Sequence, residues 1–350
     1  MAVFTIPHIK LSGIAGCVPQ QTQDNKDIEI LPPNERELFI NTVGIRYRKV
    51  VPDGVTASDL CYAAAEKLLT DLNWSRDEIK ILVFITQTPD YLIPNTSSIL
   101  QDKLKLPKSC LAFDVNLGCS GYVYGLSIIG GLLQNMPGAK ALLLVGDIST
   151  RTISMQDKST APLFSDAGTA TALEYSTMGQ IHFNLQTDGK EYDDIIIRDG
   201  AFRNPVSLQS FELKTHEGGI KRTDLSMKLD GIKIFNFALR EVAPNINTLL
   251  SEKAIDKSSI DYFIFHQANK LMLESVRKKL QLEPDKVPYS LYQYGNTSSA
   301  TIPLTMLVNL RSQLQSQPLK LLLSGFGVGL SWGSAYLETE NIICPELIEL

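Results

Sequence analysis

Apolar and polar residues follow two different periods along this chain, and the alternation between the two periods predicts most of its secondary structure. Short continuous apolar runs are typical of buried strands, and segments with apolar residues at helical spacing are typical of amphipathic helices. We expect strands near residues 8–15, 79–86, 111–117, 141–147 and 168–174. We expect helices near residues 56–72, 95–104, 120–134, 230–251, 268–280 and 299–313. This alternation of strands and helices predicts an α/β protein.

One stretch, from Asp188 to Lys228, interrupts the alternation. It is polar, contains glycines and has only weak periodicity. We interpret it as a strand-bearing connection followed by a loop over a cleft.

Much of the first part of the chain is repeated in the second part at an offset of roughly 180 residues, which is too long for a solenoid repeat. The matching segments are Ile79–Phe84 with Ile260–Phe265, Gly118–Cys119 with Gly295–Asn296, and LLLVG ending at Gly146 with LLLSG ending at Gly325. We therefore expect two related halves, residues 1–175 and 176–350. If they pack about a pseudo-twofold axis, equivalent strand ends face each other across a shared cleft.

Cys119 lies at a position that favours a reactive thiol. Asp114 to Leu117 reads as the end of a buried strand, Gly118 permits a sharp turn, and a helix begins at Ser120. The free N–H groups and the dipole at a helix N-terminus favour the thiolate form of a cysteine. The alternative interpretation is that Cys119 is a small buried apolar residue, as isolated cysteines often are.

Two other polar residues occupy comparable positions far along the chain. His266 follows the apolar run Tyr262 to Phe265, and Asn296 follows Gly295 at what we expect to be another strand-to-helix turn. Each residue alone is more often structural than functional. Three polar groups at three strand ends, however, can converge on one pocket.

Four motifs in order carry a family resemblance that runs through essentially the whole chain. GCSG at 118–121, HQAN at 266–269, YGNTS at 294–298 and GFGVGLSWGSA at 325–335 resemble the motifs of bacterial β-ketoacyl-acyl-carrier-protein synthase III. The resemblance implies a thiolase-like fold, with two pseudo-twofold-related βαβαβαββ halves in a five-layered αβαβα arrangement. It also implies a decarboxylating Claisen condensation of an acyl thioester with malonyl-acyl carrier protein (malonyl-ACP), in fatty-acid or specialised acyl biosynthesis.

The resemblance also assigns roles to residues. Cys119, His266 and Asn296 would be the catalytic triad, with Cys119 carrying the acyl group. The backbone N–H groups of Cys119 and Val328 would form the oxyanion hole. The remaining substrate contacts that it implies are Phe326, Gly327, Ile93, Leu38, Lys158, Gly231 and Ala268.

Several positions depart from the family pattern. Leu38 and Lys158 stand where other members clamp the donor's adenine between Trp and Arg, and Ile93 replaces a Phe that closes the neighbouring subunit's acyl pocket. We therefore expect weakened recognition of coenzyme A (CoA). Two basic docking positions for the acidic carrier protein are also replaced, by Asn236 and Leu271, and the adjacent cations that can compensate are Lys233 and Lys270.

Charge and cysteine content indicate which other partners the protein can bind and in which compartment it works. The net charge of -5 and the lack of a dense basic cluster argue against nucleic-acid binding. Five cysteines without CxxC spacing fit a reducing, cytoplasmic compartment, with no metal site. No segment approaches the roughly 18 apolar residues that span a bilayer. We expect no cofactor beyond the CoA or phosphopantetheine of the substrates, an acyl-CoA or acyl-ACP donor, acyl carrier protein as a partner, and a homodimer.

Two alternative functions remain open from the sequence. One is an acyltransferase on the same fold that passes the Cys119-bound acyl group to an amine or hydroxyl. The other is a non-catalytic partner subunit that binds carrier protein, although such a subunit needs none of Cys119, His266 and Asn296.

Overall fold

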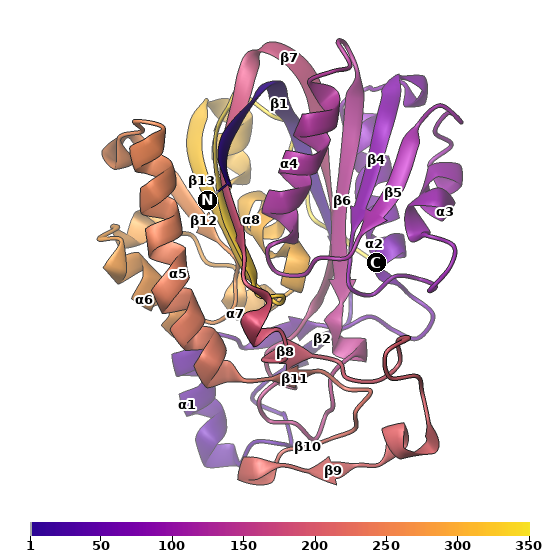
Figure 1. Cartoon of the computed structure of the whole chain (residues 1–350), viewed down its shortest axis with the longest axis vertical. Helices are drawn as coiled ribbons and strands as arrows, with labels where there is room; N and C mark the ends of the chain where they lie inside the picture. Colours follow the sequence, from indigo (N-terminus) through magenta and orange to yellow (C-terminus); the bar gives the residue numbers. More distant parts are fainter. Residues whose placement is uncertain (1) are drawn as a thin grey trace.

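A computed structural model describes residues 2–350 and shows layers of helices and sheets (Figure 1). The helices are α1 Pro33–Val43, α2 Ala57–Asp71, α3 Thr96–Lys103, α4 Gly121–Leu133, α5 Gly231–Glu252, α6 Lys270–Lys279, α7 Leu291–Tyr294 and α8 Thr301–Ser316. The main strands are β1 Ala2–Val18, β4 Ile79–Ile85, β5 Leu111–Val115, β6 Lys140–Ile148, β7 Asp166–Thr187, β12 Tyr262–Phe265, β13 Leu319–Gly327, β14 Ser331–Thr339 and β15 Ile348–Glu349. The six predicted helices are confirmed, each within about three residues of its predicted ends.

All of these strands belong to one hydrogen-bonded network, in the order β12-β13-β14-β7-β6-β4-β5, with β1 beside β7 and β15 beside β1. The long strand β7 joins the two parts of this sheet. One part contains β4, β5 and β6, and the other contains β12, β13 and β14. Residues 166–174 of β7 pair with β6, and residues 181–187 pair with β14. The predicted strand 168–174 is therefore the first part of a longer strand, which β1 accompanies over most of its length.

The helices lie in three layers around the two parts of the sheet. α2 and α3 pack on the part that contains β4, β5 and β6, while α5 packs on β13 and β14 with α6 beside it. α4 and α8 lie between the two parts and contact strands of both (Figure 1). The result is an αβαβα arrangement in five layers.

Smaller elements lie below these layers in Figure 1. Residues 188–229 contain two short antiparallel pairs, formed by β8 (Ile195–Ile196) with β11 (Lys228–Leu229) and by β9 (Lys214–Thr215) with β10 (Lys221–Arg222). A further hairpin pairs β2 (Thr22–Asp24) with β3 (Tyr47–Lys49). The helix α1 was not predicted, because Ile40 is its only buried residue and so it lacks an apolar face.

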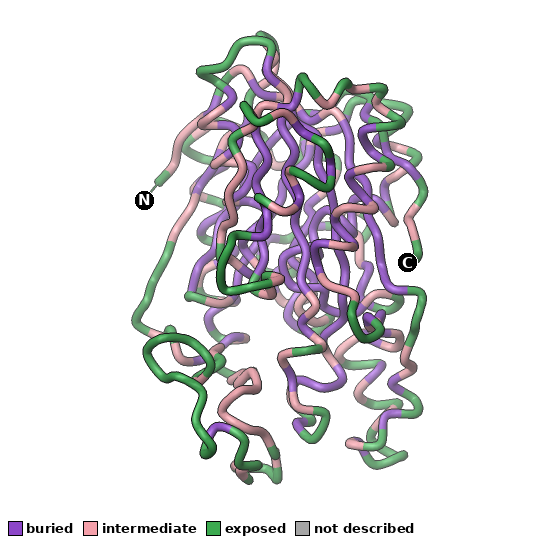
Figure 2. The backbone as a smooth tube through the Cα atoms, turned by 90° about the vertical axis from the view of Figure 1, so that its right-hand side faces the viewer, coloured by how far each residue is buried: buried purple, intermediate pink, exposed green. Residues whose placement is uncertain are grey.

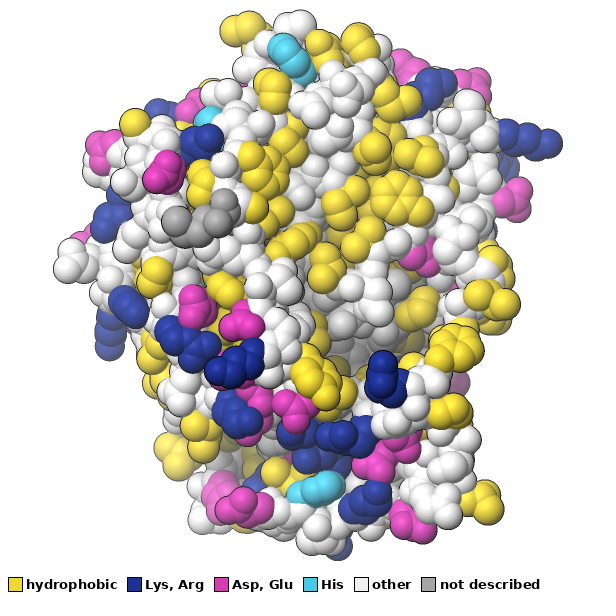
Figure 3. All heavy atoms as spheres, in the orientation of Figure 1, with side chains coloured by type: hydrophobic (Ala, Val, Ile, Leu, Met, Phe, Trp, Pro, Cys, Tyr) yellow, Lys and Arg dark blue, Asp and Glu magenta, His cyan; other side chains and the backbone are white. Residues whose placement is uncertain are grey.

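Burial follows the layers. Buried residues fill the sheet region, while exposed chain forms the outer loops (Figure 2). On the face shown in Figure 3, hydrophobic side chains gather in front of α4 and β6, and charged side chains are concentrated below them.

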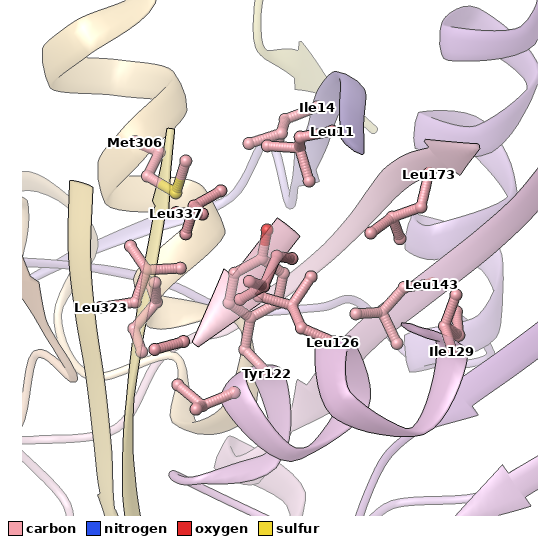
Figure 4. Close-up of a cluster of buried hydrophobic side chains, with 14 of the residues drawn as sticks. Leu11, Ile14, Tyr122, Leu126, Ile129, Leu143, Leu173, Met306, Leu323 and Leu337 are labelled. Carbon is pink, nitrogen blue, oxygen red and sulfur yellow. The ribbon is translucent and has the colours of Figure 1, made fainter. Parts of the chain in front are cut away.

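The core between the two parts of the sheet is formed by α4, α8 and the strands on both sides. Tyr122 is fully buried there (Figure 4). Its hydroxyl lies 3.2 Å from Thr171 Oγ1. The side chains labelled in Figure 4 are Leu11, Ile14, Tyr122, Leu126, Ile129, Leu143, Leu173, Met306, Leu323 and Leu337. α4, which begins next to Cys119, therefore packs against strands from both ends of the chain.

Candidate active site

Cys119 lies between β5 and α4, as the sequence predicts. The strand before it is not buried, however: β5 ends the sheet, Leu111 is exposed, and the other residues of the strand are half-buried. The turn at Gly118 is tight, since a Cβ there would overlap the side chains of Gln87 and Val328. Cys119 is thus placed by a sharp turn and by the buried helix α4 rather than by a buried strand.

The expectation that Cys119 is a thiolate in the free protein is wrong. Burial, with a smaller contribution from the negative charge of Asp147, raises the pKa of the Cys119 thiol to about 12. The backbone N–H groups of Val328 and Cys119 and the hydroxyl of Ser298 act in the opposite direction. At neutral pH the side chain is therefore a thiol, surrounded by donors that stabilise negative charge once charge forms.

Asp147 is a buried carboxylate with no cationic partner within hydrogen-bond distance among the described residues. Its Oδ1 accepts from the N–H of Gln87 at 2.7 Å and from Thr86 Oγ1 at 3.2 Å. Its Oδ2 accepts from Ser299 through N–H at 3.2 Å and Oγ at 2.5 Å. Burial raises its pKa, and these hydrogen bonds oppose that rise. Asp147 thereby ties the end of β4 to the turn that carries Asn296.

His266 directly follows β12, as predicted, and is buried. Burial lowers its pKa to about 3, so the imidazole is neutral at physiological pH. Its Nδ1 lies 2.8 Å from Thr301 Oγ1, and its ring meets that of Phe326 edge to face, with centroids 5.6 Å apart. These contacts fix the ring orientation and leave Nε2 as the nitrogen without a described partner.

Asn296 occupies a turn, but the element before it differs from the prediction. It follows the four-residue helix α7 rather than a strand, and it forms a single bridge with Phe164. Its Oδ1 accepts from the N–H of Ser298 at 2.9 Å. Within residues 2–350 no acceptor engages its Nδ2, which is therefore available as a donor.

The turn between β13 and β14 closes the site beside Cys119. A Cβ at Gly327 would lie 2.8 Å from Cys119 Sγ, so only glycine allows this approach. The hydroxyls of Ser120 and Ser331 lie 2.7 Å apart and join α4 to β14. The backbone N–H of Val328, in the same turn, lowers the pKa of the Cys119 thiol.

Ser298 connects the three predicted catalytic residues. Its N–H donates to Asn296 Oδ1 at 2.9 Å, and its carbonyl accepts from the hydroxyl of Thr301, which lies 2.8 Å from His266 Nδ1. Its own hydroxyl lowers the pKa of the Cys119 thiol. It has a φ of 51°, which is uncommon for a residue other than glycine. Strained backbone of this kind is typical of sites where geometry matters for function.

The predicted donor-binding residues lie at the surface. Leu38 on α1 is 67 % exposed and Ile93 is 86 % exposed. Lys158 is exposed and forms no ion pair with the described residues. Gly231 is the exposed first residue of α5, and a Cβ there would meet nothing within 4 Å. Ala268 is half-buried, and its N–H donates to the His266 carbonyl at 3.0 Å.

The two lysines predicted to dock a carrier protein differ in their surroundings. Lys233 Nζ lies 2.8 Å from Oδ1 of Asp194, a fully buried carboxylate, so its charge is neutralised locally. Lys270 is exposed at the start of α6 and forms no ion pair with residues 2–350. Of the two, only Lys270 presents an unpaired charge.

Over the described part of the chain, no cluster of three or more His, Cys, Asp or Glu side chains could hold a metal ion. None of the helices described is both long and apolar enough to cross a membrane.

Comparison with known proteins identifies the family. Residues 113–189 match the 3-oxoacyl-[acyl-carrier-protein] synthase III family, and residues 250–339 match the C-terminal family of the same enzyme. The β-ketoacyl-[acyl-carrier-protein] synthase III of Streptococcus pyogenes is 31 % identical over 328 residues, which cover 93 % of this chain and 97 % of that protein. The chain belongs to the 3-oxoacyl-ACP synthase III family. Members are acyltransferases, and so is this protein.

Solved structures agree with this assignment. A 3-oxoacyl-ACP synthase from Burkholderia xenovorans is 38 % identical, with a TM-score of 0.93 and 99 % of each chain covered. A second 3-oxoacyl-ACP synthase III is 35 % identical, with a TM-score of 0.90, covering 95 % of this chain and 99 % of the other. The priming β-ketosynthase of the R1128 polyketide pathway shares the fold at 22 % identity, with a TM-score of 0.81 over 96 % of this chain and 97 % of the other. The predicted thiolase-like fold is confirmed.

Three polar residues of this synthase III site were missed by the sequence analysis: Asp147, Ser298 and Thr301. Asp147 left a usable signal, because a carboxylate directly after a buried apolar run needs a buried partner. In the internal repeat Asp147 corresponds to Phe326, so the two halves place different chemistry at equivalent strand ends. Ser298 and Thr301 left no signal, since Ser and Thr are common near helix starts.

Proposed function

We propose that this protein catalyses a decarboxylating Claisen condensation, in which an acyl group carried on Cys119 is joined to malonyl-ACP to give a 3-oxoacyl-ACP. One observation carries the proposal. The Cys119 sulfur meets the turn at Gly327 so closely that a Cβ there would lie 2.8 Å from it, and the turn that carries Asn296 also carries Thr301, which contacts His266. In this arrangement Cys119 can attack a thioester, and His266 and Asn296 can stabilise an enolate.

In the first half-reaction, the Cys119 sulfur attacks the donor thioester carbonyl. The tetrahedral oxyanion accepts hydrogen bonds from the N–H groups of Cys119 and Val328. Collapse breaks the donor carbon–sulfur bond, and the thiol proton of Cys119 ends on the departing thiol. Because burial holds the Cys119 pKa at about 12, sulfur deprotonation accompanies donor binding and does not precede it.

In the second half-reaction, malonyl-ACP loses carbon dioxide and its thioester oxygen takes on enolate charge. Asn296 Nδ2 and His266 Nε2 donate to that oxygen. The enolate carbon attacks the acyl carbonyl, the bond to Cys119 breaks, and the released sulfur takes a proton from solvent. Low polarity around His266 keeps its ring neutral and strengthens each hydrogen bond to the developing charge.

Product analysis tests the proposal. Incubation of the protein with acetyl donor and malonyl-ACP is expected to yield 3-oxoacyl-ACP with one carbon dioxide per product, measured by mass spectrometry and gas release. Transfer of the acyl group to an amine or hydroxyl without carbon dioxide would instead identify an acyltransferase of the alternative kind. A protein that never acquires the acyl mass would be a carrier-binding partner.

Leu38 and Lys158 stand at the positions where the adenine of a CoA donor would bind. Leu38 and Lys158 offer no planar surface for an adenine ring, and Leu38 is largely exposed to solvent. Aromatic and cation–π contacts to a ring contribute about 0.5–2 kcal/mol each. We therefore assign the donor specificity mainly to the pantetheine arm and acyl group, near Phe326, Gly327, Gly231, Ala268 and Ile93.

Acylation rates check this assignment. We expect acetyl-pantetheine to acylate Cys119 within about 10-fold of the acetyl-CoA rate, because little binding energy comes from the nucleotide. The double variant Leu38→Trp with Lys158→Arg is expected to increase the rate with acetyl-CoA and leave that with acetyl-pantetheine unchanged. A wild-type preference for acetyl-CoA of several orders of magnitude would refute the assignment.

For the carrier protein, we place docking at Lys270, because its charge is unpaired and acidic carrier surfaces complement a cation. Lys233 contributes less, because Asp194 already neutralises it. We also place the protein in the cytoplasm, where a reducing compartment keeps all five cysteines as free thiols.

We propose that the protein is a homodimer in which a second copy covers β5. This strand ends the sheet, so its outer edge has unpaired backbone groups. The loop before α3 lies beside it, since Asp114 of β5 accepts from the N–H groups of Thr96 and Ser97 at 2.6 and 2.7 Å. Exposed apolar side chains surround this edge, namely Tyr91, Leu92, Ile93 and Leu111. Figure 3 shows further hydrophobic side chains over β6 and α4.

A charge-introducing variant tests the dimer. Leu92→Glu combined with Ile93→Glu is expected to give a monomer by light scattering, because an isologous interface would bring both new carboxylates together with their copies. Met178→Glu is the matched control, since Met178 is 89 % exposed on β7, away from β5. A monomeric wild type, or a double variant that stays dimeric, would contradict the proposed interface.

A further inference from the structure

Asp147 is a fully buried carboxylate that contacts two turns of the candidate active site at once. Its Oδ1 accepts from the N–H of Gln87, whose side chain packs against the turn that precedes Cys119. Its Oδ2 accepts from the N–H and the hydroxyl of Ser299, three residues after Asn296. One carboxylate therefore connects the turn of the nucleophile with the turn of Asn296.

The backbone of Asn296 is held by other groups, but its side-chain amide is not. The Asn296 N–H donates to the Leu163 carbonyl at 3.0 Å, and the Asn296 carbonyl accepts from the Ser165 N–H at 2.9 Å. Among residues 2–350, only the Ser298 N–H engages the amide, by donating to Oδ1 at 2.9 Å. That hydrogen bond decides the orientation of the amide, because an amide held by its oxygen leaves Nδ2 as the free donor.

Ser298 depends on its surroundings to keep this hydrogen bond. Its φ of 51° lies in the left-handed region, which residues other than glycine adopt at an energetic cost. Strained backbone persists only where the surrounding structure over-determines it. The next residue, Ser299, supplies such a constraint, because its N–H and its hydroxyl both donate to one oxygen of Asp147, at 3.2 and 2.5 Å.

We infer that Asp147 is a positioning residue for condensation. By holding Ser299, it keeps the Ser298 N–H on Asn296 Oδ1, so that Nδ2 is presented to the enolate oxygen. The inference rests on the proposed condensation for its kinetic consequence, while the geometry can be measured independently.

Acylation does not use this arrangement. The first half-reaction depends on Cys119 and the oxyanion hole. Burial and, to a smaller extent, the charge of Asp147 raise the pKa of the Cys119 thiol, so this carboxylate does not assist attack by the sulfur. Removal of the Asp147 side chain is therefore expected to slow condensation without slowing acylation, whereas a general loss of structure would slow both.

Two variants test this difference with an acetyl donor and malonyl-ACP. Asp147→Ala removes the acceptor for Ser299. We expect it to become acylated at about the wild-type rate by intact mass, and to release carbon dioxide about 10- to 100-fold more slowly, since misplacing a catalytic group by about 1 Å costs up to about 10² in rate. Ser299→Ala removes only one of the two donors to Oδ2 and is expected to show the same pattern with a smaller loss. It decides the question if Asp147→Ala does not fold. Equal losses of acylation and condensation would overturn the inference.

A double-mutant cycle tests whether Asp147 acts through Asn296. In the Asn296→Ala background there is no amide left to orient, so Asp147→Ala, or Ser299→Ala in its place, is expected to cause no further loss of decarboxylation. The same loss in both backgrounds would contradict the inference, because Asp147 would then support the site in some other way.

Asp166→Ala is the matched control. Asp166 is also fully buried and accepts from two backbone N–H groups and one hydroxyl, but these belong to Val51 and Thr150 and not to the turn of Asn296. We expect any loss caused by Asp166→Ala to be the same in the wild-type and Asn296→Ala backgrounds. Coupling to Asn296 as strong as that of Asp147 would refute a specific role for Asp147.

A crystal structure of Asp147→Ala tests the geometry without reference to activity. We expect the Ser298 nitrogen to move out of hydrogen-bonding range of Asn296 Oδ1 and the φ of Ser298 to leave the left-handed region. A distance that stays at 2.9 Å would overturn the inference. If the variant shows the expected shift but the wild type forms no 3-oxoacyl product, the proposed function fails and the positioning of Asn296 by Asp147 stands.

Discussion

Replacing Cys119 by alanine is expected to abolish acyl-enzyme formation. Cys119 is the only cysteine of the described chain whose sulfur is approached by the N–H groups of both its own residue and Val328. Burial raises the pKa of the Cys17 and Cys344 thiols to about 12, and it raises that of Cys61 as well. Intact mass after incubation with acyl donor measures the result.

Cys110→Ala is the control for this experiment. Cys110 is half-buried, and burial raises its pKa to about 11, so it is the cysteine best able to react in place of Cys119. We expect Cys110→Ala to acquire the acyl mass as the wild type does. An acyl mass on the Cys119→Ala protein would rule out Cys119 as the nucleophile.

Removing either enolate donor is expected to leave acylation intact and to slow malonyl decarboxylation by about 10² or more, the scale for loss of an oxyanion donor. His266→Ala removes Nε2, and Asn296→Ala removes Nδ2, while the donors around the Cys119 sulfur remain. Acylation is followed by intact mass, and decarboxylation by carbon dioxide release from malonyl-ACP.

Asn296→Asp sharpens the test. It keeps an oxygen for the Ser298 N–H, which Asn296 Oδ1 accepts at 2.9 Å, but replaces the donor with a carboxylate. We expect it to lose decarboxylation at least as severely as Asn296→Ala, because a negative charge there would repel the enolate. Acylation of each variant is an internal check of folding. Condensation at the wild-type rate in any of the three would remove that residue from the enolate role.

The helices could be predicted because the signal for them is local. α4 and α5 bury one face each, so their apolar residues recur at helical spacing and can be counted in the sequence. α1 buries only Ile40 and lacks that signal. β7 was predicted short because its middle residues are half-buried or exposed where the strand passes between its two pairing partners.

The candidate site could also be predicted, because motifs around Cys119, His266 and Asn296 occur in a recognisable order along the chain, although Asn296 follows α7 rather than the expected strand. Its chemistry could not be predicted in the same way. A helix N-terminus favours thiolate, but desolvation and Asp147 outweigh it, and Asp147 reaches the site from β6. Burial is a property of the packed molecule and has no fixed pattern in the sequence.

The sequence by itself determined the α/β layers, the repeat, the family and the three candidate catalytic residues, because periodicity and motif order are properties of the linear sequence. Only the tertiary structure decided protonation and pairing. It makes Cys119 a thiol and His266 a neutral ring, sets Thr301 beside Nδ1, and neutralises Lys233 with a buried Asp194. Each of these depends on groups that are distant in sequence and brought within a few ångströms by folding, where the loss of water changes the energy of every charge.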